Sequence, residues 1–484
     1  MQQRSSLRGT IALLLISIFS FSSFAFAQTD CSTLTFPTIS GTIHQDLATR
    51  QTYANDFGGS VSQVPCTVAK PASNSDVQAL ISFARQHAIP VAVRGAGHVD
   101  NGQSQVNGGL VIDMKNMNQV LSMTPTYADV QAGMLWSALV VQTNTSFQAT
   151  PKVLTTELGT TIGGTLSVGG IGPFAARHGF QIDNVIDIDV VDGRGLLFTC
   201  SPTQNQALFY SVLGGMGQYG IITRAKISLQ PSPQYVRQYY FAYLDIQTLI
   251  SDVMMAANDG RFTGVQGLAL PNQLGGFVYL MQAFQQHSDI VGTTLGDPAR
   301  FSGLHNVGAP VIQDTTWYPD FTNDTGFKDR MVLTGEWAKP HPWAGFFLPE
   351  NQITTFIQTN FSQINSADFG INGGILLLPG KRVQNHPTIF ETPEIANGSR
   401  FLLVGLLYNA SDATRAAQLQ ALNQTMLANV LNLGGKAYPF GTMPQGSTQW
   451  TQQFGTNLNT AKTRKQIHDP DNIFNPGLGI FNGL

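Results

Sequence analysis

Residues 91–113 read VAVRGAGHVDNGQSQVNGGLVID, and this pattern predicts a strand, a glycine-rich turn, a loop and a second strand. The strands are the apolar runs Val91–Val93 and Leu110–Ile112. Gly95 and Gly97 bracket one alanine in the turn, and glycine allows a backbone to adopt angles closed to other residues and to approach a ligand closely. Successive amides in such a turn can point inward and bind a phosphate. We therefore expect the rest of the chain to be organised around this turn.

His98 lies directly on the turn, and the residues alone leave two interpretations of it open. The first is a loop histidine without a chemical role, which is the commoner case for a lone glycine-flanked histidine. The second is a nucleophilic imidazole beside a pyrophosphate-binding loop, tethering a flavin. The common nucleotide-binding motifs do not fit, because Asp100 stands where the third glycine of G-x-G-x-x-G belongs and no Gly-Lys-Ser/Thr follows.

A second glycine-rich region, TTIGGTLSVGGIG at residues 160–172, predicts backbone packed against a flat or phosphorylated ligand. The alternative is a turn-rich connection between strands. A serine nucleophile is disfavoured here, because Thr165 rather than glycine stands two residues before Ser167.

A helix is expected just before the first glycine turn, between Ser73 and His87. Ser75 and Gln78 form a capping box at its start, and Pro90 lies just after its end. Its apolar residues fall on one face: Val77, Leu80, Ile81 and Ala84.

The bulk composition excludes several classes of protein. The 484 residues carry a net charge of -3, so nothing indicates a nucleic acid or another polyanion as a partner. Charged residues make up 11% of the chain, against about 25% for a typical soluble domain. We expect no metal site, because HExxH is absent and no histidine or cysteine lies at ligand spacing from His341.

Residues 1–27 predict a secretory signal peptide. Arg4 and Arg8 supply its positive charge, Ile11–Phe26 is mostly apolar, and Ala25–Ala27 is a small-x-small cleavage site. The alternative is a membrane anchor, but the run is short for a span and no second long apolar segment follows. We expect cleavage after Ala27, no membrane association of the mature chain, and a secreted, periplasmic or extracellular location.

Three cysteines remain after this segment, and an oxidising compartment permits a disulfide. We hypothesise a bridge between Cys31 and Cys66, because both flank the start of the domain. Cys200 is then a small buried residue at the end of a strand.

Several segments together resemble one known family. RGAGHVDNGQSQ (94–105), ARHGFQIDNVIDIDVVDGRG (176–195) and the tail TRKQIHDPDNIFNPGLGIF (463–481) look like the vanillyl-alcohol-oxidase type of FAD oxidoreductase. FVYLMQAF (277–284) and the Pro-His-Pro-Trp segment at 340–343 resemble the substrate domain of the cytokinin dehydrogenases within that class.

This resemblance implies an α+β, two-domain fold of the PCMH type, with the substrate domain inserted into the FAD-binding domain. Pro231-Ser232-Pro233 interrupts the pattern of strands near the first boundary. The implied division is 28–236 for the first part of the FAD domain, 237–441 for the α+β substrate domain, and 442–484 for the C-terminal return to the FAD domain.

The resemblance also implies FAD bound covalently through its 8α-methyl group to His98, and hydride transfer from a small substrate to flavin N5. Bicovalent relatives add a cysteine where this chain has Glu157, so a single bond is expected. Besides His98, the implied cofactor contacts are Val93, Gly95, Ala96, Gly97, Val99, Gln103, Thr161, Ser167, Ile171, Ile222, Tyr438, Asn475 and Leu478.

The substrate chemistry departs from the family pattern. The cytokinin enzymes place an aspartate base where this chain has Thr156, and a supporting glutamate near Gln282. A hydroxyl and an amide are not bases near neutral pH. Glu157 is adjacent to Thr156, but in an extended chain it would point the other way unless the loop shifts by one residue. The candidate catalytic residues are therefore Thr156, Glu157 and Gln282.

Three functions remain open at this point. The first is oxidation of cytokinins or similar N6-alkyl adenines or amines. The second is oxidation of an alcohol or a sugar by the same fold, with another residue as base. The third is a flavin-carrying binding protein whose substrate site has decayed. The electron acceptor, oxygen or another molecule, is not readable from these residues.

Overall fold

The computed structural model describes residues 31–288, 297–322, 325–381, 389–395 and 400–481. The predicted signal segment 1–27 lies outside these residues. Helices and strands alternate irregularly, which confirms the predicted α+β class. The strands are β1 (Thr42–His44), β2 (Thr67–Lys70), β3 (Val91–Arg94), β4 (Leu110–Asp113), β5 (Val120–Thr124), β6 (Tyr127–Gln131), β7 (Ala149–Pro151), β8 (Val185–Val191), β9 (Leu197–Cys200), β10 (Ile221–Pro231), β11 (Tyr235–Tyr243), β12 (Gly264–Pro271), β13 (Phe277–His287), β14 (Val307–Thr316), β15 (Ala344–Pro349), β16 (Gly374–Gly380), β17 (Phe401–Leu407) and β18 (Lys436–Ala437).

The helices connect and cover these strands. They are α1 (Leu47–Thr52), α2 (Asn74–Gln86), α3 (Trp136–Phe147), α4 (Ile162–Leu166), α5 (Ala175–His178), α6 (Gln206–Val212), α7 (Ile246–Asp259), α8 (Asp297–Phe301), α9 (Thr325–Leu333), α10 (Ile353–Asn360), α11 (Ala413–Asn432), α12 (Gly446–Phe454) and α13 (Leu458–His468). Two of the short 3-10 turns matter below, η5 (Glu336–Ala338) and η10 (Pro476–Leu478).

Helix α2 forms where it was expected, and its four predicted apolar residues are buried. The predicted capping box is wrong. The cap is Ser73, whose hydroxyl accepts a hydrogen bond from the backbone N–H of Asp76 at 3.1 Å. The cap therefore lies two residues before the predicted one, because the serine that directly precedes the helix has an extended conformation.

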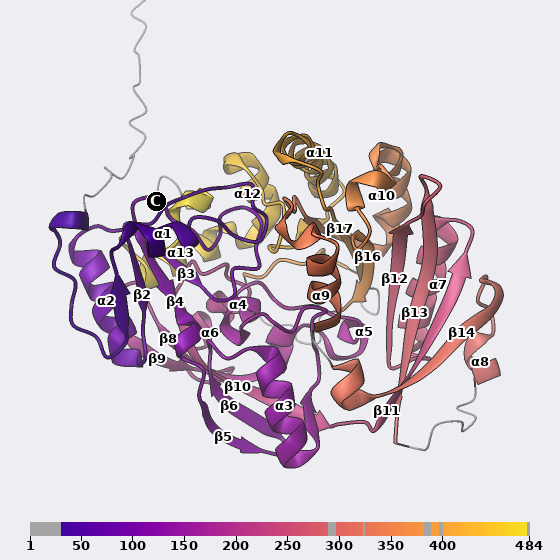
Figure 1. Ribbon diagram of the computed structural model, residues 1–484, viewed down its shortest axis with the longest axis horizontal. Coiled ribbons are helices and arrows are strands. Elements are labelled where there is room, and N and C mark those ends of the chain that lie inside the picture. Colours follow the sequence, from indigo (N-terminus) through magenta and orange to yellow (C-terminus); the bar gives the residue numbers. More distant parts are fainter. Residues whose placement is uncertain (1–30, 289–296, 323–324, 382–388, 396–399, 482–484) are drawn as a thin grey trace, which may run out of the picture.

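The strands of the described residues form three sheets, and the first two lie in the same half of the molecule (Figure 1). The first has the order β1-β2-β4-β3, and β4 lies parallel to both β2 and β3. The second is antiparallel around β10, which pairs with β6, β7 and β8. β10 ends at Pro231, and the next strand, β11, belongs to the third sheet.

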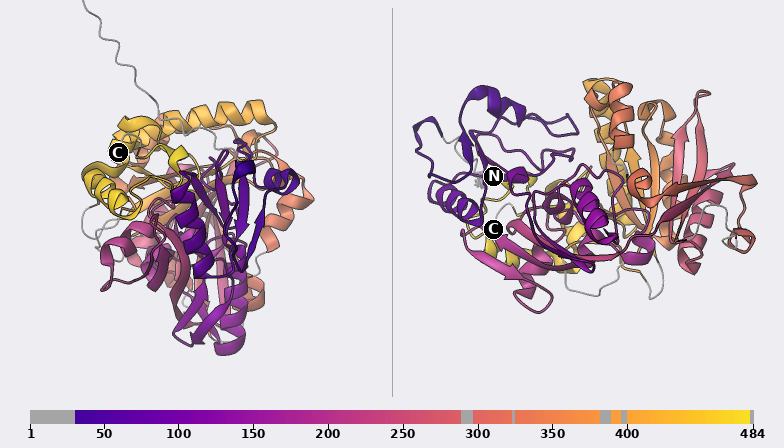
Figure 2. Two further views of the ribbon diagram at one scale, coloured as in Figure 1. Left: turned by 90° about the vertical axis from the view of Figure 1, so that its left-hand side faces the viewer. Right: turned by 60° about the horizontal axis from the view of Figure 1, so that its bottom comes forward.

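The end of the chain returns to the first sheet. The backbone N–H of Asn475 donates to the carbonyl of Val91 at 2.9 Å, and the N–H of Val91 donates to the carbonyl of Ile473 at 2.8 Å. Figure 2 shows the last helices, in yellow, beside the indigo N-terminal elements. Residues 473–475 therefore extend the edge of β3, directly before the glycine turn.

The third sheet is antiparallel, with the order β14-β11-β13-β12-β16-β17-β15-β18. Because side chains alternate along a strand, each of its central strands presents one face to helices α7, α10 and α11 and the other to the first half of the molecule. In β12, Val265 and Ala269 pack in the helix-side core, whereas Gln266, Leu268 and Leu270 face a cavity. Both faces are covered, which explains the continuous apolar sequence of β17.

Cys31 and Cys66 form a disulfide, as hypothesised. Cys200 is fully buried at the end of β9, also as expected. Because the bridge restricts the unfolded chain between residues 35 apart in sequence, we expect the double variant Cys31→Ser/Cys66→Ser to lower the free energy of unfolding by about 2–4 kcal/mol. Denaturant titration under non-reducing conditions measures this loss.

The matched control is Cys200→Ala, which removes a buried thiol without opening a cross-link. We expect it to cost about 1 kcal/mol. An equal loss in the two variants would show that the bridge contributes nothing beyond the packing of its atoms.

Candidate functional site

A cavity of about 510 Å³ lies between the two halves of the molecule. The first glycine turn, the second glycine-rich region and the inner face of the third sheet all contribute to its wall. Its size falls within the usual range for ligand pockets, about 300–1,000 Å³. Among the residues that line it, only Glu157 and Arg330 carry a full charge near pH 7.

The structure brings almost all of the sequence-predicted site residues to this cavity. The exception is Leu478, which lies on η10 and packs against the hydrophobic core instead. The predicted residues that line the cavity are Val93, Gly95, Ala96, Gly97, His98, Val99, Gln103, Thr156, Glu157, Thr161, Ser167, Ile171, Ile222, Gln282, Tyr438 and Asn475.

The two glycine regions pack directly on each other. A side chain at Gly95 would collide with the hydroxyl of Thr161, which caps α4 by accepting a hydrogen bond from the N–H of Gly164 at 3.3 Å. Gly97 adopts φ +75°, in the left-handed region, which residues that carry a side chain rarely enter. Both glycines are thus required where they stand, and together they hold the backbone against the cavity.

His98 projects from this turn into an aromatic cluster. Its ring centroid lies 4.3 Å from that of Phe57 and 5.5 Å from that of Trp343, which it meets edge-on. Burial, with smaller contributions from His341 and Lys328, lowers the pKa of His98 to about 4. The imidazole is therefore neutral at pH 7 and keeps a lone pair available for bond formation.

The Pro-His-Pro-Trp segment anchors the turn from the opposite half of the molecule. The backbone N–H of Trp343 donates to Oδ2 of Asp100 at 3.0 Å, and the N–H of His341 donates to the carbonyl of Gly58 at 2.9 Å. Burial and the neighbouring Asp56 raise the pKa of Asp100 well above its usual value. Trp343 is buried and also lines the cavity, so it belongs both to the core and to the wall of the site.

The lining fits a flavin nucleotide. Two buried donors, Nε2 of Gln103 and the hydroxyl of Ser104, have no hydrogen-bond partner among the described residues, and both residues line the cavity. Buried donors of this kind are normally satisfied, and the carbonyl and phosphate oxygens of FAD are acceptors.

The loop that carries Thr156 and Glu157 differs from the expectation. Between β7 and α4 the chain forms turns rather than a strand, and the hydroxyl of Thr155 donates to the carbonyl of Glu157 at 2.9 Å. The two neighbours therefore do not point in opposite directions, and both line the cavity. Thr156 is exposed and Glu157 is half-buried. Oε1 of Glu157 accepts a hydrogen bond from the N–H of Gly159 at 3.0 Å.

The third sheet supplies a mostly apolar wall with two amides. Gln282 of β13 and Gln266 of β12 lie opposite each other in the strand register, and Nε2 of Gln266 donates to Oε1 of Gln282 at 2.7 Å. Gln266 escaped the sequence analysis because only strand pairing places it beside Gln282. The apolar part of this wall is Leu268, Leu270, Ile375, Leu376, Leu378, Leu403 and Leu407.

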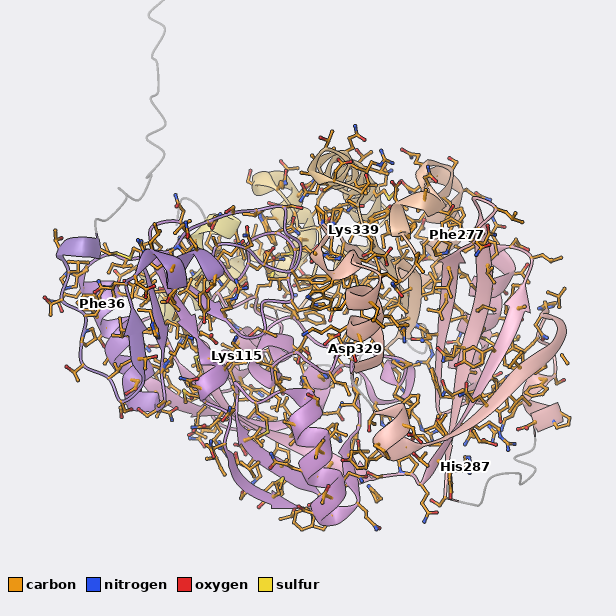
Figure 3. The ribbon with its side chains drawn as sticks, in the orientation of Figure 1. Phe36, Lys115, Phe277, His287, Asp329 and Lys339 are labelled. Atoms are coloured by element: carbon orange, nitrogen blue, oxygen red, sulfur yellow. A yellow bond between two sulfur atoms is a disulfide. The ribbon has the colours of Figure 1, made fainter. Side chains whose placement is uncertain are left out.

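Helix α9 closes part of the cavity through Phe327 and Arg330. In Figure 3, Asp329 on this helix and Lys339 just after η5 lie in the middle of the molecule, between the two halves. The sequence analysis missed both lining residues, because α9 has a weak amphipathic pattern that carries no signal of a site.

The described residues contain neither a candidate metal site nor a candidate membrane-spanning helix. No three histidine, cysteine, aspartate or glutamate side chains there are placed to hold a metal ion. Among the same residues, no helix has both the length and the apolar character needed to span a bilayer.

Comparison with known proteins gives consistent matches over both halves of the chain. Residues 65–201 match the family described as FAD binding domain, and residues 302–481 match the family described as cytokinin dehydrogenase 1, FAD and cytokinin binding. An uncharacterized oxidoreductase, ORF5 in the fasciation locus of Rhodococcoides fascians, is 33% identical over 91% of this chain and 99% of its own length. Cytokinin dehydrogenase 6 of Oryza sativa subsp. japonica is 30% identical over 92% of each chain. Cytokinin dehydrogenase 2 of Arabidopsis thaliana is 29% identical over 88% of this chain and 91% of its own.

Proposed function

The chain belongs to the cytokinin dehydrogenase family of FAD-dependent oxidoreductases, and we propose that it carries FAD covalently on His98 and oxidises an N6-alkyl adenine or a similar secondary amine. The observation that carries the proposal is the neutral imidazole of His98 on a glycine turn that lines the cavity. A protonated imidazole has no lone pair for the new bond, whereas this one is neutral over the whole physiological range.

The proposed attachment joins FAD to His98 and needs a two-electron oxidant. With FAD bound, His98 would hold it through one bond between an imidazole nitrogen and the 8α-carbon, with loss of the proton from the imidazole and of one hydrogen from that carbon. Dioxygen would take the two electrons released and leave as hydrogen peroxide. The aromatic cluster of Phe57, Trp337 and Trp343 holds the imidazole in place for this step.

In the proposed oxidation, bound FAD supplies a two-electron acceptor that takes a hydrogen with its electron pair from the carbon beside the substrate nitrogen. The chain's own part is to accept the N–H proton and to orient the substrate. Glu157 is the one carboxylate that lines the cavity, and a carboxylate is a competent base where a hydroxyl is not. We therefore place the base at Glu157 rather than at Thr156.

The wall of the third sheet supports the proposed substrate class. Its leucines suit an apolar N6 substituent, and the amide of Gln266 suits the hydrogen-bonding edge of a purine. Residues 372–374, which also line the cavity, add backbone groups at the same place.

We also propose that the protein is exported after cleavage behind Ala27. The disulfide between Cys31 and Cys66 supports this, because such bonds persist mainly in oxidising compartments. Mass spectrometry of the protein recovered from medium or periplasm tests it, and an N-terminus that retains residues 1–27 would reject it.

The experiment that tests the function is an anaerobic titration of the purified holoprotein with isopentenyladenine, followed by flavin absorption. We expect the flavin band to bleach with one equivalent of substrate. A band that stays oxidised with isopentenyladenine and bleaches with an alcohol or a sugar would reject the adenine assignment and favour oxidation of that substrate. If flavin is bound but none of these substrates reduces it, the result would favour a flavin-carrying binding protein.

A further inference from the structure

A chain of polar side chains crosses four neighbouring strands on the face of the third sheet that lines the cavity. It begins at Thr315 of β14 and continues through Gln238 and Tyr240 of β11 to Gln282 of β13 and Gln266 of β12. All five side chains are at least partly buried. Because buried polar groups need partners, each donor in this chain must meet an acceptor, and the pattern has a direction.

A backbone carbonyl sets that direction. The hydroxyl of Thr315 donates to the carbonyl of Val236 at 3.5 Å, so its oxygen accepts from Nε2 of Gln238 at 3.4 Å. Oε1 of Gln238 is then left as an acceptor, and it receives hydrogen bonds from the hydroxyl of Tyr240 at 3.1 Å and from Nε2 of Gln282 at 2.9 Å.

Gln282 has no donor left for a substrate, and its acceptor oxygen is already engaged. Its Nε2 donates to Gln238 and also to the hydroxyl oxygen of Tyr240 at 3.0 Å, which uses both amide hydrogens. Its Oε1 accepts from Nε2 of Gln266 at 2.7 Å. Gln282 lines the cavity, but its amide is committed to the chain.

Gln266 ends the chain with an open acceptor. Its side chain is 9% exposed, it lines the cavity, and its Oε1 has no hydrogen-bond partner among the described residues. A buried carbonyl without a partner destabilises the structure. A ligand that donates a hydrogen bond at this point removes that cost, and a ligand that presents a lone pair there adds repulsion.

We propose that Oε1 of Gln266 accepts a hydrogen bond from an N–H or O–H of the substrate, that Gln282 is a positioning residue, and that the site therefore selects donors over isosteric acceptors. This inference rests on the proposed function for the class of substrate. The N–H compared below is also the group whose proton Glu157 would accept in the proposed function, so the variant Gln266→Met, which leaves Glu157 in place, separates the two acceptors.

The test compares two purines of nearly equal shape, 6-benzylaminopurine and 6-benzyloxypurine, in which N–H is replaced by oxygen. Binding to the oxidised holoprotein is followed under anaerobic conditions by the shift of the flavin spectrum at short times, and catalysis by kcat and KM. We expect the wild type to bind the amine at least about tenfold more tightly, because the ether leaves the buried acceptor unpaired. We expect Gln266→Met, which keeps the length of the side chain, to bind both within about threefold.

Three further variants test this interpretation. Gln266→Glu keeps an acceptor oxygen and is expected to retain the preference for the amine. Gln285→Met makes the same substitution on the neighbouring strand β13, outside the cavity lining, and it is expected to bind like the wild type. Gln282→Met releases Gln266, and we expect it to reduce the preference without raising KM for both purines equally.

The inference is overturned if Gln266→Met keeps the tenfold preference, or if the wild type shows none while binding both purines. A wild type that binds neither purine rejects the adenine assignment instead. In that case the alcohol or sugar that reduces the flavin is compared with its O-methyl or N-methyl derivative, in the wild type and in Gln266→Met. If Gln266→Met still prefers the unmethylated substrate as strongly as the wild type does, the inference is overturned.

Discussion

His98→Ala is expected to abolish covalent flavin completely while leaving a folded protein that still binds FAD reversibly. The imidazole is the proposed nucleophile, whereas the glycine turns that line the cavity are held by contacts with other residues. Precipitation with acid, followed by absorption of pellet and supernatant, measures the result. All flavin should stay with the wild-type pellet, and all of it should appear in the supernatant of the variant.

The matched control is His178→Ala. Burial also lowers the pKa of His178 to about 4, but this residue does not line the cavity, so its flavin should remain attached. Flavin that stays in the His98→Ala pellet would place the tether at another residue.

The lowered pKa of His98 also predicts how the attachment of flavin to the wild-type protein responds to pH. With a pKa of about 4, His98 becomes protonated, and so loses its lone pair, only well below pH 6. The rate at which apoprotein and FAD form the covalent bond should therefore change less than about twofold between pH 8 and pH 6. A histidine with an ordinary pKa of about 6.5 would lose roughly three quarters of its neutral form by pH 6, and a fourfold decline would contradict the burial of the ring.

Glu157→Gln is expected to lower kcat/KM for the reducing substrate by about 10²–10⁴-fold, because it removes the proposed base while keeping the size of the side chain. The amide oxygen still accepts from the N–H of Gly159 as Oε1 does now, so the loop should keep its form. Stopped-flow reduction of the flavin under anaerobic conditions measures the loss, and an unchanged flavin spectrum before mixing shows that the cofactor site is intact.

Thr156→Val tests the neighbouring position at which the family pattern places its base. Thr156 lines the same cavity but offers only a hydroxyl, so we expect a decrease of no more than about tenfold, well short of the effect of a lost base. If Thr156→Val were as damaging as Glu157→Gln, the proton would leave through the threonine position. If neither variant lost activity, the base would lie outside this loop.

Local patterns predicted the elements that surround the turn. The helical spacing of apolar residues identified α2, and the short apolar runs identified β3 and β4. Both signals are local, because each depends only on residues close together in the sequence. The cap of α2 was misplaced by two residues, since Ser73 and Ser75 are equally good cap residues in sequence and only the backbone conformation distinguishes them.

The position of Glu157 shows a different limit. An extended chain would turn it away from Thr156, but the hydrogen bond from Thr155 to its carbonyl, together with that from Gly159 to its carboxylate, folds the loop. These contacts are local in sequence, yet their geometry depends on α4 and β7, which hold the ends of the loop. The sequence therefore indicated both residues of this loop, but the direction of their side chains followed only from the folded loop.

The sequence by itself determined the glycine turn with His98 and the resemblance that connects it with FAD, because backbone conformation at glycine and the identity of a nucleophile are properties of single residues. Only the tertiary structure decided that Trp343 and Asp100 join the two halves beside His98 and that burial keeps this imidazole neutral. It also decided that Gln266, rather than Gln282, ends a directed chain of hydrogen bonds at the cavity. Burial and the direction of a hydrogen bond are properties of several strands packed together, and no short stretch of sequence contains them.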